Sequence, residues 1–447
     1  MAEASNTLEL AINSQISPTQ TIGISTSLYA SESSVVASEA KISATENAKS
    51  APEPTYAGIP VEPTQDAVEG IKFDFNDGIR ILIPKGEKGY FIRFSDTEAG
   101  VVLFQGEVKP GAYIASSKKF YAKYRLEIFD IGKFNPIFVH TYDAKDREVM
   151  IQLPVGTLGD SIGWFSYVER FQIKHQCKLL CVMTPWIADL VRNQYPNIKF
   201  ITKEAVKDYK PYACYYMGLF FKGDVDHQPQ DFRYAGLHRT VSFILGVSQD
   251  DIPPRFDLSK PRQIKEKYVC IAAQSSSQAK YWNNPFGWFE VVRFLKSQGY
   301  RVLAMDKEPI HGVGTHWNYI PYGAEDFTGN RPLQERVDII KDADFFIGLS
   351  SGLSWVAWGC KVPVVLISGF TEPYNEFYTP YRVINYHACT GCWNDMRCEF
   401  DHNDFLWCPR HKNDERQFEC SRMISSEQVI QTIKKIPTFR PLKPAAK

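Results

Sequence analysis

Residues 148–184 read EVMIQLPVGTLGDSIGWFSYVERFQIKHQCKLLCVMT, and this stretch decides the fold. An apolar strand, EVMIQLPV, is followed by a glycine-rich turn, GTLGDSIG, then a helix, WFSYVERFQIKH, and a second apolar strand, CKLLCVMT. Strands that alternate with helices predict a parallel sheet in an α/β protein. The turn would then lie at the carboxyl end of a parallel strand, where the ligand sites of open α/β sheets are found.

A second alternating block begins at KYVCIAAQ and continues through WFEVVRFLKSQ, RVLAMD, LQERVDIIKDA, DFFIGL and VPVVLIS. The polar, proline-containing stretch SQDDIPPRFDLSKPRQ (248–263) separates it from the first block. Two such blocks predict two Rossmann-like halves that face one another across a cleft.

The flanking segments have different compositions. Residues 1–65 are rich in Ser, Thr, Ala, Glu and Pro and poor in aromatics, which predicts disorder. Short alternating runs such as IRILIPK and YRLEIFD follow and predict a small antiparallel β domain. The predicted divisions are a tail (1–65), the β domain (66–145), a first Rossmann-like domain (146–260), a second Rossmann-like domain (261–385), a cysteine segment (386–422) and a C-terminal helix and tail (423–447).

Composition excludes several classes of function. Lys plus Arg equals Asp plus Glu at 51 each, so no overall basic field exists to hold nucleic acid or an anionic membrane. No apolar run is long enough to span a bilayer, and none of signal-peptide length precedes Lys41. We therefore expect a cytoplasmic protein, in which clustered cysteines are metal ligands or redox groups rather than disulfides.

The first candidate site is the turn that holds Asp160. We expect Gly156, Gly159 and Gly163 to let the backbone turn tightly after the strand. Asp160 could then remove a proton from an acceptor hydroxyl. The alternative is that Asp160 or Ser161 only caps the following helix.

Two further candidates lie in the second block. Lys280 and Trp282 stand in the loop AAQSSSQAKYWNNPFGW (272–288), where a lysine could neutralise a phosphate leaving group or simply be a solvated loop residue. Ser351 and Gly352 lie in IGLSSGLSWVAWG (347–359), where backbone amides could contact a pyrophosphate, although close strand-to-helix packing explains the same small residues.

The cysteine segment, CTGCWNDMRCEFDHNDFLWCPRHKNDERQFEC (389–420), holds five of the ten cysteines. Four thiolates suit a structural zinc or a mononuclear iron site, and a metal would replace a core in a segment with no periodic apolar face. The predicted ligands are Cys389, Cys392, Cys408 and Cys420, with Cys398 spare. His387, His402 and His411 are expected at the surface.

Together, the Gly-Asp turn, the Lys-x-Trp loop and the Ser-Gly turn resemble the glycosyltransferase-B enzymes that use ADP-heptose. The similarity is greatest to the bacterial autotransporter heptosyltransferases, which add a small N-terminal β domain and a four-cysteine iron finger, and it covers roughly residues 70–435. Lipopolysaccharide heptosyltransferases carry Asp-Ser/Thr-Gly-x-x-His at the third turn, whereas this chain has SSGLSW (350–355). That difference argues against a lipopolysaccharide acceptor.

The resemblance implies a role for each candidate residue. Asp160 would be the general base, Lys280 would stabilise the donor diphosphate, Ser351 and Gly352 would hold the pyrophosphate or heptose, and Trp282 would lie near the nucleotide. It also implies ADP-D-glycero-D-manno-heptose as donor and serines of an autotransporter adhesin passenger domain as acceptor, with inversion. One ferric iron per chain and a homo-oligomer, a dodecamer, are further implications, as are an acceptor domain at 146–260, a nucleotide-sugar domain at 261–385 and a four-cysteine metal finger at 386–422.

Rival interpretations remain open at this stage. The donor could be an ADP- or UDP-hexose, the metal could be zinc, and the protein could be a non-catalytic scaffold that binds autotransporters.

Overall fold

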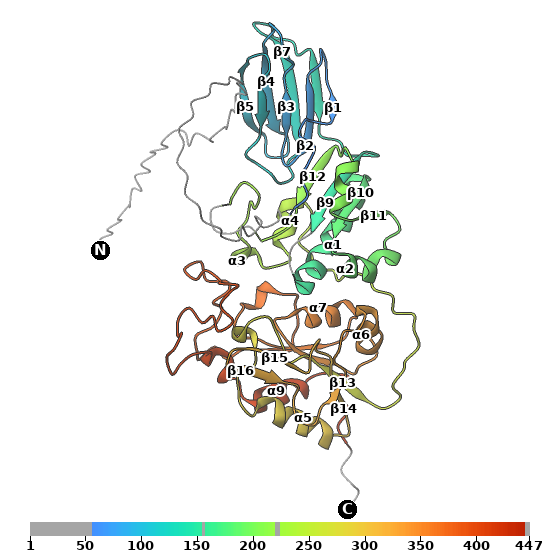
Figure 1. Ribbon diagram of the computed structural model, residues 1–447, viewed down its shortest axis with the longest axis vertical. Helices are drawn as coiled ribbons and strands as arrows, with labels where there is room; N and C mark the ends of the chain where they lie inside the picture. The colour runs from blue at the N-terminus through green and yellow to red at the C-terminus, as the bar shows by residue number, and fades with distance from the viewer. Residues whose placement is uncertain (1–55, 154–156, 220–223, 443–447) are drawn as a thin grey trace, which may run out of the picture.

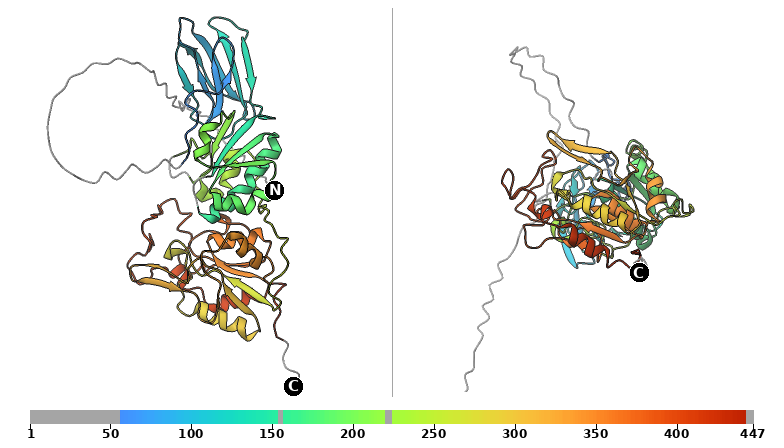
Figure 2. Two further views of the ribbon diagram at one scale, coloured as in Figure 1. Left: turned by 45° about the vertical axis from the view of Figure 1, so that its right-hand side comes forward. Right: turned by 90° about the horizontal axis from the view of Figure 1, so that it is seen from below.

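The computed structural model describes residues 56–153, 157–219 and 224–442. Figure 1 shows three tiers along the long axis: an antiparallel sheet at one end, a first α/β half in the middle and a second α/β half at the other end. The turned view in Figure 2 preserves this order. The predicted pair of Rossmann-like halves is confirmed.

The first half is built on an eight-stranded sheet with the order β11-β10-β9-β12-β2-β3-β6 and with β1 beside β2. Its central strand β9 is buried along nearly its whole length, as an apolar run in a parallel sheet should be. The strands are β1 (Gln65–Asp66), β2 (Lys72–Asn76), β3 (Arg80–Leu82), β6 (Tyr113–Ala115), β9 (Glu148–Leu153), β10 (Lys178–Met183), β11 (Ile198–Ile201) and β12 (Ala213–Tyr216).

The predicted division at residue 146 cuts through this sheet. Strand β2 pairs in parallel with β12, placing Phe75 beside Ala213, so the N-terminal strands extend the first half. The other N-terminal strands form a separate antiparallel sheet, which packs on the first through aromatic pairs such as Phe75 and Tyr124, 5.7 Å apart. They are β4 (Tyr90–Asp96), β5 (Val101–Val108), β7 (Tyr124–Asp130) and β8 (Phe138–Thr141).

The second half is a parallel sheet with the order β17-β14-β13-β18-β19-β20. A separate hairpin, β15 and β16, extends from it. The strands are β13 (Tyr268–Ile271), β14 (Arg301–Ala304), β15 (Ile310–Val313), β16 (His316–Tyr319), β17 (Glu325–Asp326), β18 (Phe346–Leu349), β19 (Val364–Ile367) and β20 (Arg382–Val383).

Helices cover both parallel sheets, and a stretch without helix or strand, residues 246–267, joins the halves. The α-helices are α1 (Leu158–His175), α2 (Pro185–Val191), α3 (Phe232–Ala235), α4 (Thr240–Leu245), α5 (Gly287–Ser297), α6 (Leu333–Ile340), α7 (Gly352–Gly359), α8 (Glu419–Arg422) and α9 (Ser426–Ile433). Short 3-10 helices lie at Arg192–Gln194, Glu204–Asp208, Gln278–Lys280 and Pro373–Asn375. No helix in the described ranges is long and apolar enough to cross a membrane.

The glycine-rich stretch is a helix start rather than a turn, which corrects the sequence-based expectation. Thr157 is the N-cap residue of α1, and the Asp160 carboxylate accepts a hydrogen bond from its backbone N–H. Gly159 and Gly163 therefore lie inside the helix, and Gly156 falls outside the described residues.

These glycines serve a close contact between the halves. A Cβ at Gly159 would lie 2.8 Å from Cδ1 of Trp355 on α7, and one at Gly163 would lie 3.0 Å from Cζ3 of the same ring. On the other side, a Cβ at Gly352 would lie 2.8 Å from Leu158. Helix α1 can approach α7 this closely because no side chains intervene.

The predicted disordered tail extends too far. Residues 56–65 are ordered: Ala57 donates its N–H to Gln152 Oε1 at 3.0 Å, and the Tyr56 hydroxyl donates to the Met217 carbonyl at 2.8 Å. The remainder of the predicted tail, residues 1–55, lies outside the described residues.

We predict that Gly159→Ala destabilises the protein. The new methyl group would push on a Trp355 ring that is only 2% exposed, and overpacking of this kind costs about 1–3 kcal/mol. The expected result is a lower midpoint of thermal unfolding than in wild type. Gly58→Ala is the matched control, because a Cβ there meets nothing within 4 Å. Equal midpoints for both variants would contradict the packing argument.

Candidate functional site

A cavity of about 790 Å³ lies between the two halves. The start of α1 supplies one wall, and the loops after β13, β14, β18 and β19 supply the other. Asp160, Lys280, Ser351 and Gly352 all line this cavity, so the structure brings together four of the residues singled out from the sequence.

Asp160 faces the cavity from the first turn of α1. Its Oδ2 accepts hydrogen bonds from the Thr157 N–H at 2.5 Å and from the Thr157 hydroxyl at 3.0 Å. Neither bond uses Oδ1. Burial raises the pKa of the Asp160 carboxyl, while the Thr157 hydrogen bonds and the charge of Lys280 oppose that rise. Asp160 therefore does cap α1, and its second oxygen is not used by the cap.

Lys280 enters the same cavity from the opposite half. Its Nζ lies 5.3 Å from the ring centroid of Phe370, 5.9 Å from that of Phe400 and 3.4 Å from Ser276 Oγ. Burial lowers the pKa of this lysine, and the charges of Asp160 and Glu376 counteract the fall. The ammonium group of Lys280, held among aromatic rings, offers a positive charge to an anionic group in the cavity.

The third wall is the start of α7. Ser351 is its N-cap residue and donates its own N–H to the Leu349 carbonyl at 2.7 Å, so the N–H groups that a ligand could use begin at Gly352, the first residue of the helix. Ser350 is tied down beneath them: its hydroxyl lies 3.0 Å from Ser368 Oγ and 2.8 Å from Thr371 Oγ1. This rigid, positively polarised corner can accept a phosphate.

Trp282 is placed elsewhere, which corrects its expected position near a nucleotide. The side chain is 4% exposed, its indole N–H donates to the Ile424 carbonyl at 2.9 Å, and its ring packs on Trp288 and over Gly287. It does not line the cavity. Trp282, two residues after Lys280, therefore belongs to the hydrophobic core that packs against α5 and α9.

Two buried carboxylates of the cavity were missed from the sequence. Asp306, just after β14, accepts N–H bonds from Ala273 at 2.9 Å and Gln274 at 3.0 Å, and burial raises its pKa to about 6. Its position after the run RVLAMD at a strand end could have signalled it. Glu376, 3% exposed and paired with Arg382 at 2.8 Å, carries no such signal.

The cysteine segment forms part of the cavity wall. Trp393, Phe400 and His402 all line it, so His402 is not merely a surface residue. The segment also holds the lysine loop, because the Phe405 carbonyl accepts hydrogen bonds from the Gln278 N–H at 2.9 Å and the Ser277 hydroxyl at 3.3 Å. Any group that orders this segment thereby shapes the site.

Among the four predicted metal ligands, Cys420 lies close enough to Cys389, Cys392 and Cys408 for their charges to interact. Cys392, Cys408 and Cys420 are buried, Cys389 is half-buried, and all ten cysteines are free thiols. Burial raises the pKa of Cys420, and the neighbouring charges of the other three thiols raise it further. Contrary to expectation, an apolar cluster forms here; it contains Cys392 and Cys408 together with the rings of Phe370, Trp393, Phe400, Trp407 and Phe418. Four soft donors in a short segment suit iron or zinc.

A second group of ligand-capable atoms adjoins Cys389. Its thiol, a ring nitrogen of His411 and a carboxylate oxygen of Glu419 all lie within 4.8 Å of one another. Glu419 is already held by Arg416, at 2.6 and 2.8 Å, and His411 Nδ1 lies 3.0 Å from Asp414. These existing partners fit outer groups that orient a ligand thiol better than ligands themselves.

Two family models match the chain. Residues 68–132 match the N-terminal domain of glycosyltransferase TibC, and residues 233–399 match glycosyltransferase family 9 (heptosyltransferase). The second match includes the cavity loops from Lys280 to Glu376 and part of the cysteine segment.

Several known proteins are similar to this chain along most of its length. The autotransporter heptosyltransferase Aah of Escherichia coli is 52% identical over 86% of this chain and 98% of that protein. The structure of dodecameric iron-containing heptosyltransferase TibC of E. coli in complex with ADP-D-β-D-heptose is 52% identical, with a TM-score of 0.82 over 85% of this chain and 99% of that one.

A third relative, named as the inactive autotransporter heptosyltransferase BimC of Burkholderia thailandensis, is 41% identical over 84% of this chain and 88% of that protein. The two α/β halves, the N-terminal sheet and the cleft between the halves are expected of a chain that is 41–52% identical to these relatives. The chain belongs to the autotransporter heptosyltransferase family.

Proposed function

We propose that this glycosyltransferase moves heptose from ADP-D-glycero-D-manno-heptose to serine hydroxyls of an autotransporter adhesin passenger domain. The single observation that carries the proposal is the pairing of Asp160 and Lys280, which approach one cavity from opposite halves with opposite charges. Because an inactive relative exists, this geometry supports transfer more directly than the family name does.

The proposed mechanism divides the work between the halves. Asp160 takes the proton of the acceptor serine through its unused oxygen, and the serine oxygen forms a bond to the anomeric carbon as the bond to the ADP oxygen breaks. Lys280 and the backbone N–H of Gly352 stabilise the charge that develops on the departing diphosphate, while the Ser351 hydroxyl contacts the pyrophosphate or heptose. A direct displacement of this kind inverts the anomeric centre.

Iron would have an architectural role in this proposal. Cys389, Cys392, Cys408 and Cys420 would hold one ferric ion, which would link distant parts of the segment and reinforce its aromatic cluster. The segment would then present Phe400 beside Lys280 and keep the loop at Ser277 in place. Zinc would serve the same purpose, and the iron-containing relative favours iron.

Assembly and location complete the proposal. A partner copy would cover the exposed apolar side chains of the β15–β16 hairpin, which are Ile310, Val313, Trp317 and Tyr319. The dodecameric relative suggests an assembly of twelve copies. We place the protein in the cytoplasm, where ten free thiols persist.

The direct test is the intact mass of a purified passenger fragment after incubation with the protein and ADP-heptose, alongside ADP-hexose and UDP-hexose. We expect heptose increments with ADP-heptose alone. Hexose increments would keep the mechanism and replace the donor. No increment from any donor would refute transfer and favour a non-catalytic, autotransporter-binding scaffold.

We predict that Asp160→Asn lowers kcat by about 10²–10⁴-fold while ADP binding is retained. Asparagine keeps an oxygen for the Thr157 N–H, so the helix cap survives while the base is lost. Single-turnover rates and ADP titration separate the two effects.

The matched control is Thr157→Val, which removes the hydroxyl contact to Asp160 and leaves the carboxylate. It should retain most of the rate. In wild type, kcat/KM should fall as pH drops through a pKa above that of an ordinary aspartate, because burial favours the protonated acid. A fully active Asp160→Asn variant would show that Asp160 only caps α1 and is not the general base.

We predict that Cys392→Ser loses the bound metal, while Cys398→Ser keeps it, because Cys398 lies outside the proposed ligand set. Elemental analysis and visible absorption measure metal content directly. The Cys392 variant should also unfold at a lower temperature and transfer heptose more slowly, since the wall at Phe400 and His402 loses its support. Full metal content in Cys392→Ser, or its loss in Cys398→Ser, would overturn the ligand assignment.

A further inference from the structure

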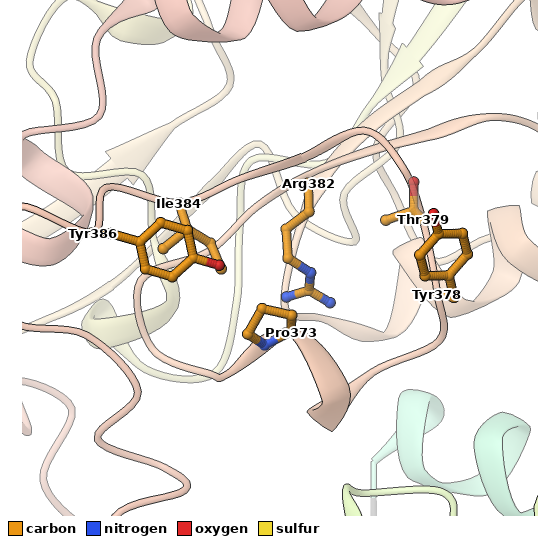
Figure 3. A pocket seen from close by; sticks show the side chains of 6 residues that line it. All are labelled: Pro373, Tyr378, Thr379, Arg382, Ile384 and Tyr386. Atoms are coloured by element: carbon orange, nitrogen blue, oxygen red, sulfur yellow. The ribbon is translucent and has the colours of Figure 1, made fainter. Parts of the chain in front are cut away.

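A second, smaller pocket of about 210 Å³ lies beside the cleft in the second half. Figure 3 shows the Arg382 guanidinium at its centre, with Tyr386 on one side, Tyr378 and Thr379 on the other and Pro373 below. Ile384 completes the lining. None of these residues lines the larger cavity.

Arg382 carries an unsatisfied donor into this pocket. The side chain is 8% exposed, its Nη2 donates to Glu376 Oε2 at 2.8 Å, and its buried Nη1 has no hydrogen-bond partner among the described residues. A buried donor without an acceptor costs free energy, so an oxygen atom supplied by a ligand would be favoured there.

The charge of Arg382 is already matched. The buried Glu376 carboxylate pairs with its guanidinium at 2.8 Å, so a second anion in the pocket would be repelled by Glu376. The pocket therefore favours a neutral oxygen, such as a hydroxyl, over a phosphate or carboxylate.

The rim is aromatic and open. Tyr378 is 75% exposed and Tyr386 is 67% exposed, although tyrosine side chains usually bury most of the ring. The two tyrosine rings could pack against the C–H face of a pyranose ring, and the Arg382 Nη1 donor could bond to one of its hydroxyls.

Only one short turn separates this pocket from the proposed transfer site. Pro373 faces the small pocket, whereas Asn375 and Glu376 of the same turn face the large cavity. A polypeptide with one residue at the cleft could therefore place a nearby residue at this pocket.

We propose that the Arg382 pocket binds a pyranose, and that its natural occupant is a heptose already attached to the acceptor. The inference rests on the proposed function, since it assumes that the acceptor receives more than one heptose. Binding of an attached heptose in this pocket would make the once-modified acceptor a better substrate for the next transfer than the unmodified acceptor.

The test compares three probes: a passenger-derived peptide with one O-heptosylated serine, the same peptide unmodified, and free heptose. The glycopeptide should bind wild-type protein more tightly than the unmodified peptide, and Tyr386→Ala should weaken that binding about fivefold to tenfold. Free heptose should compete with the glycopeptide. Tyr322→Ala, an exposed tyrosine outside both cavities, is the matched control.

Arg382→Lys is the second variant, because it keeps a positive charge for Glu376 and removes Nη1. It should also lose the preference for the glycopeptide. Addition of the first heptose by Tyr386→Ala should match wild type, while later additions slow.

Equal binding of both peptides, or a preference that survives Tyr386→Ala and Arg382→Lys, would overturn the proposal. So would competition by the unmodified peptide that equals that of the glycopeptide. Wild-type transfer of the first heptose is measured in the same preparation. Its failure would count against the proposed function, and its success without glycopeptide preference would count against the pocket alone.

Discussion

The contact between Trp355 and the glycines of α1 is the constraint on which the cleft depends. Gly159 and Gly163 present bare backbone to the indole ring, and the ring is held from behind by Phe377 and His238, with centroids 5.0 and 5.3 Å away. The starts of α1 and α7 are consequently brought together. Asp160, two residues from the start of one helix, and Gly352, the first residue of the other, then face the same cavity.

The same contact gives a packing role to Trp355, the last residue of the third turn SSGLSW (350–355). Trp355 fills the space between the halves, and His238 beneath it is fixed to Asp251 of the linker at 2.6 Å. Asp251 also accepts a bond from the Tyr378 N–H at 3.3 Å, which ties the linker to the second half. The two halves are thus joined by packing and by hydrogen bonds to Asp251 on one side of the cleft.

Much of this arrangement could be predicted from the sequence, for identifiable reasons. Apolar runs such as EVMIQL and VVLI are long enough to signal buried strands, so the two parallel sheets were predictable. Asp160 and Lys280 follow such strands and therefore lie at their carboxyl ends. The start of α1 was misjudged, because glycines usually indicate turns and the ring they accommodate is nearly 200 residues away.

Other features depend on contacts that no local pattern carries. Strand β2 joins the first parallel sheet through β12, more than 130 residues later, so the β domain could not be seen as part of that sheet. The buried indole of Trp282 finds its acceptor in the Ile424 carbonyl, between α8 and α9 and far along the chain, and Phe400 reaches Lys280 only once the cysteine segment has folded. Site residues on strand ends were predictable, whereas those supplied by a remote segment were not.

The central claim is that one cavity, built from both halves, holds the donor between Lys280 and Asp160. A crystal structure of the protein with ADP-heptose tests it most directly. The account predicts the diphosphate within about 3 Å of Lys280 Nζ and the amides at the start of α7, with the anomeric carbon facing Asp160. A diphosphate bound away from Lys280, or a heptose turned away from Asp160, would contradict it.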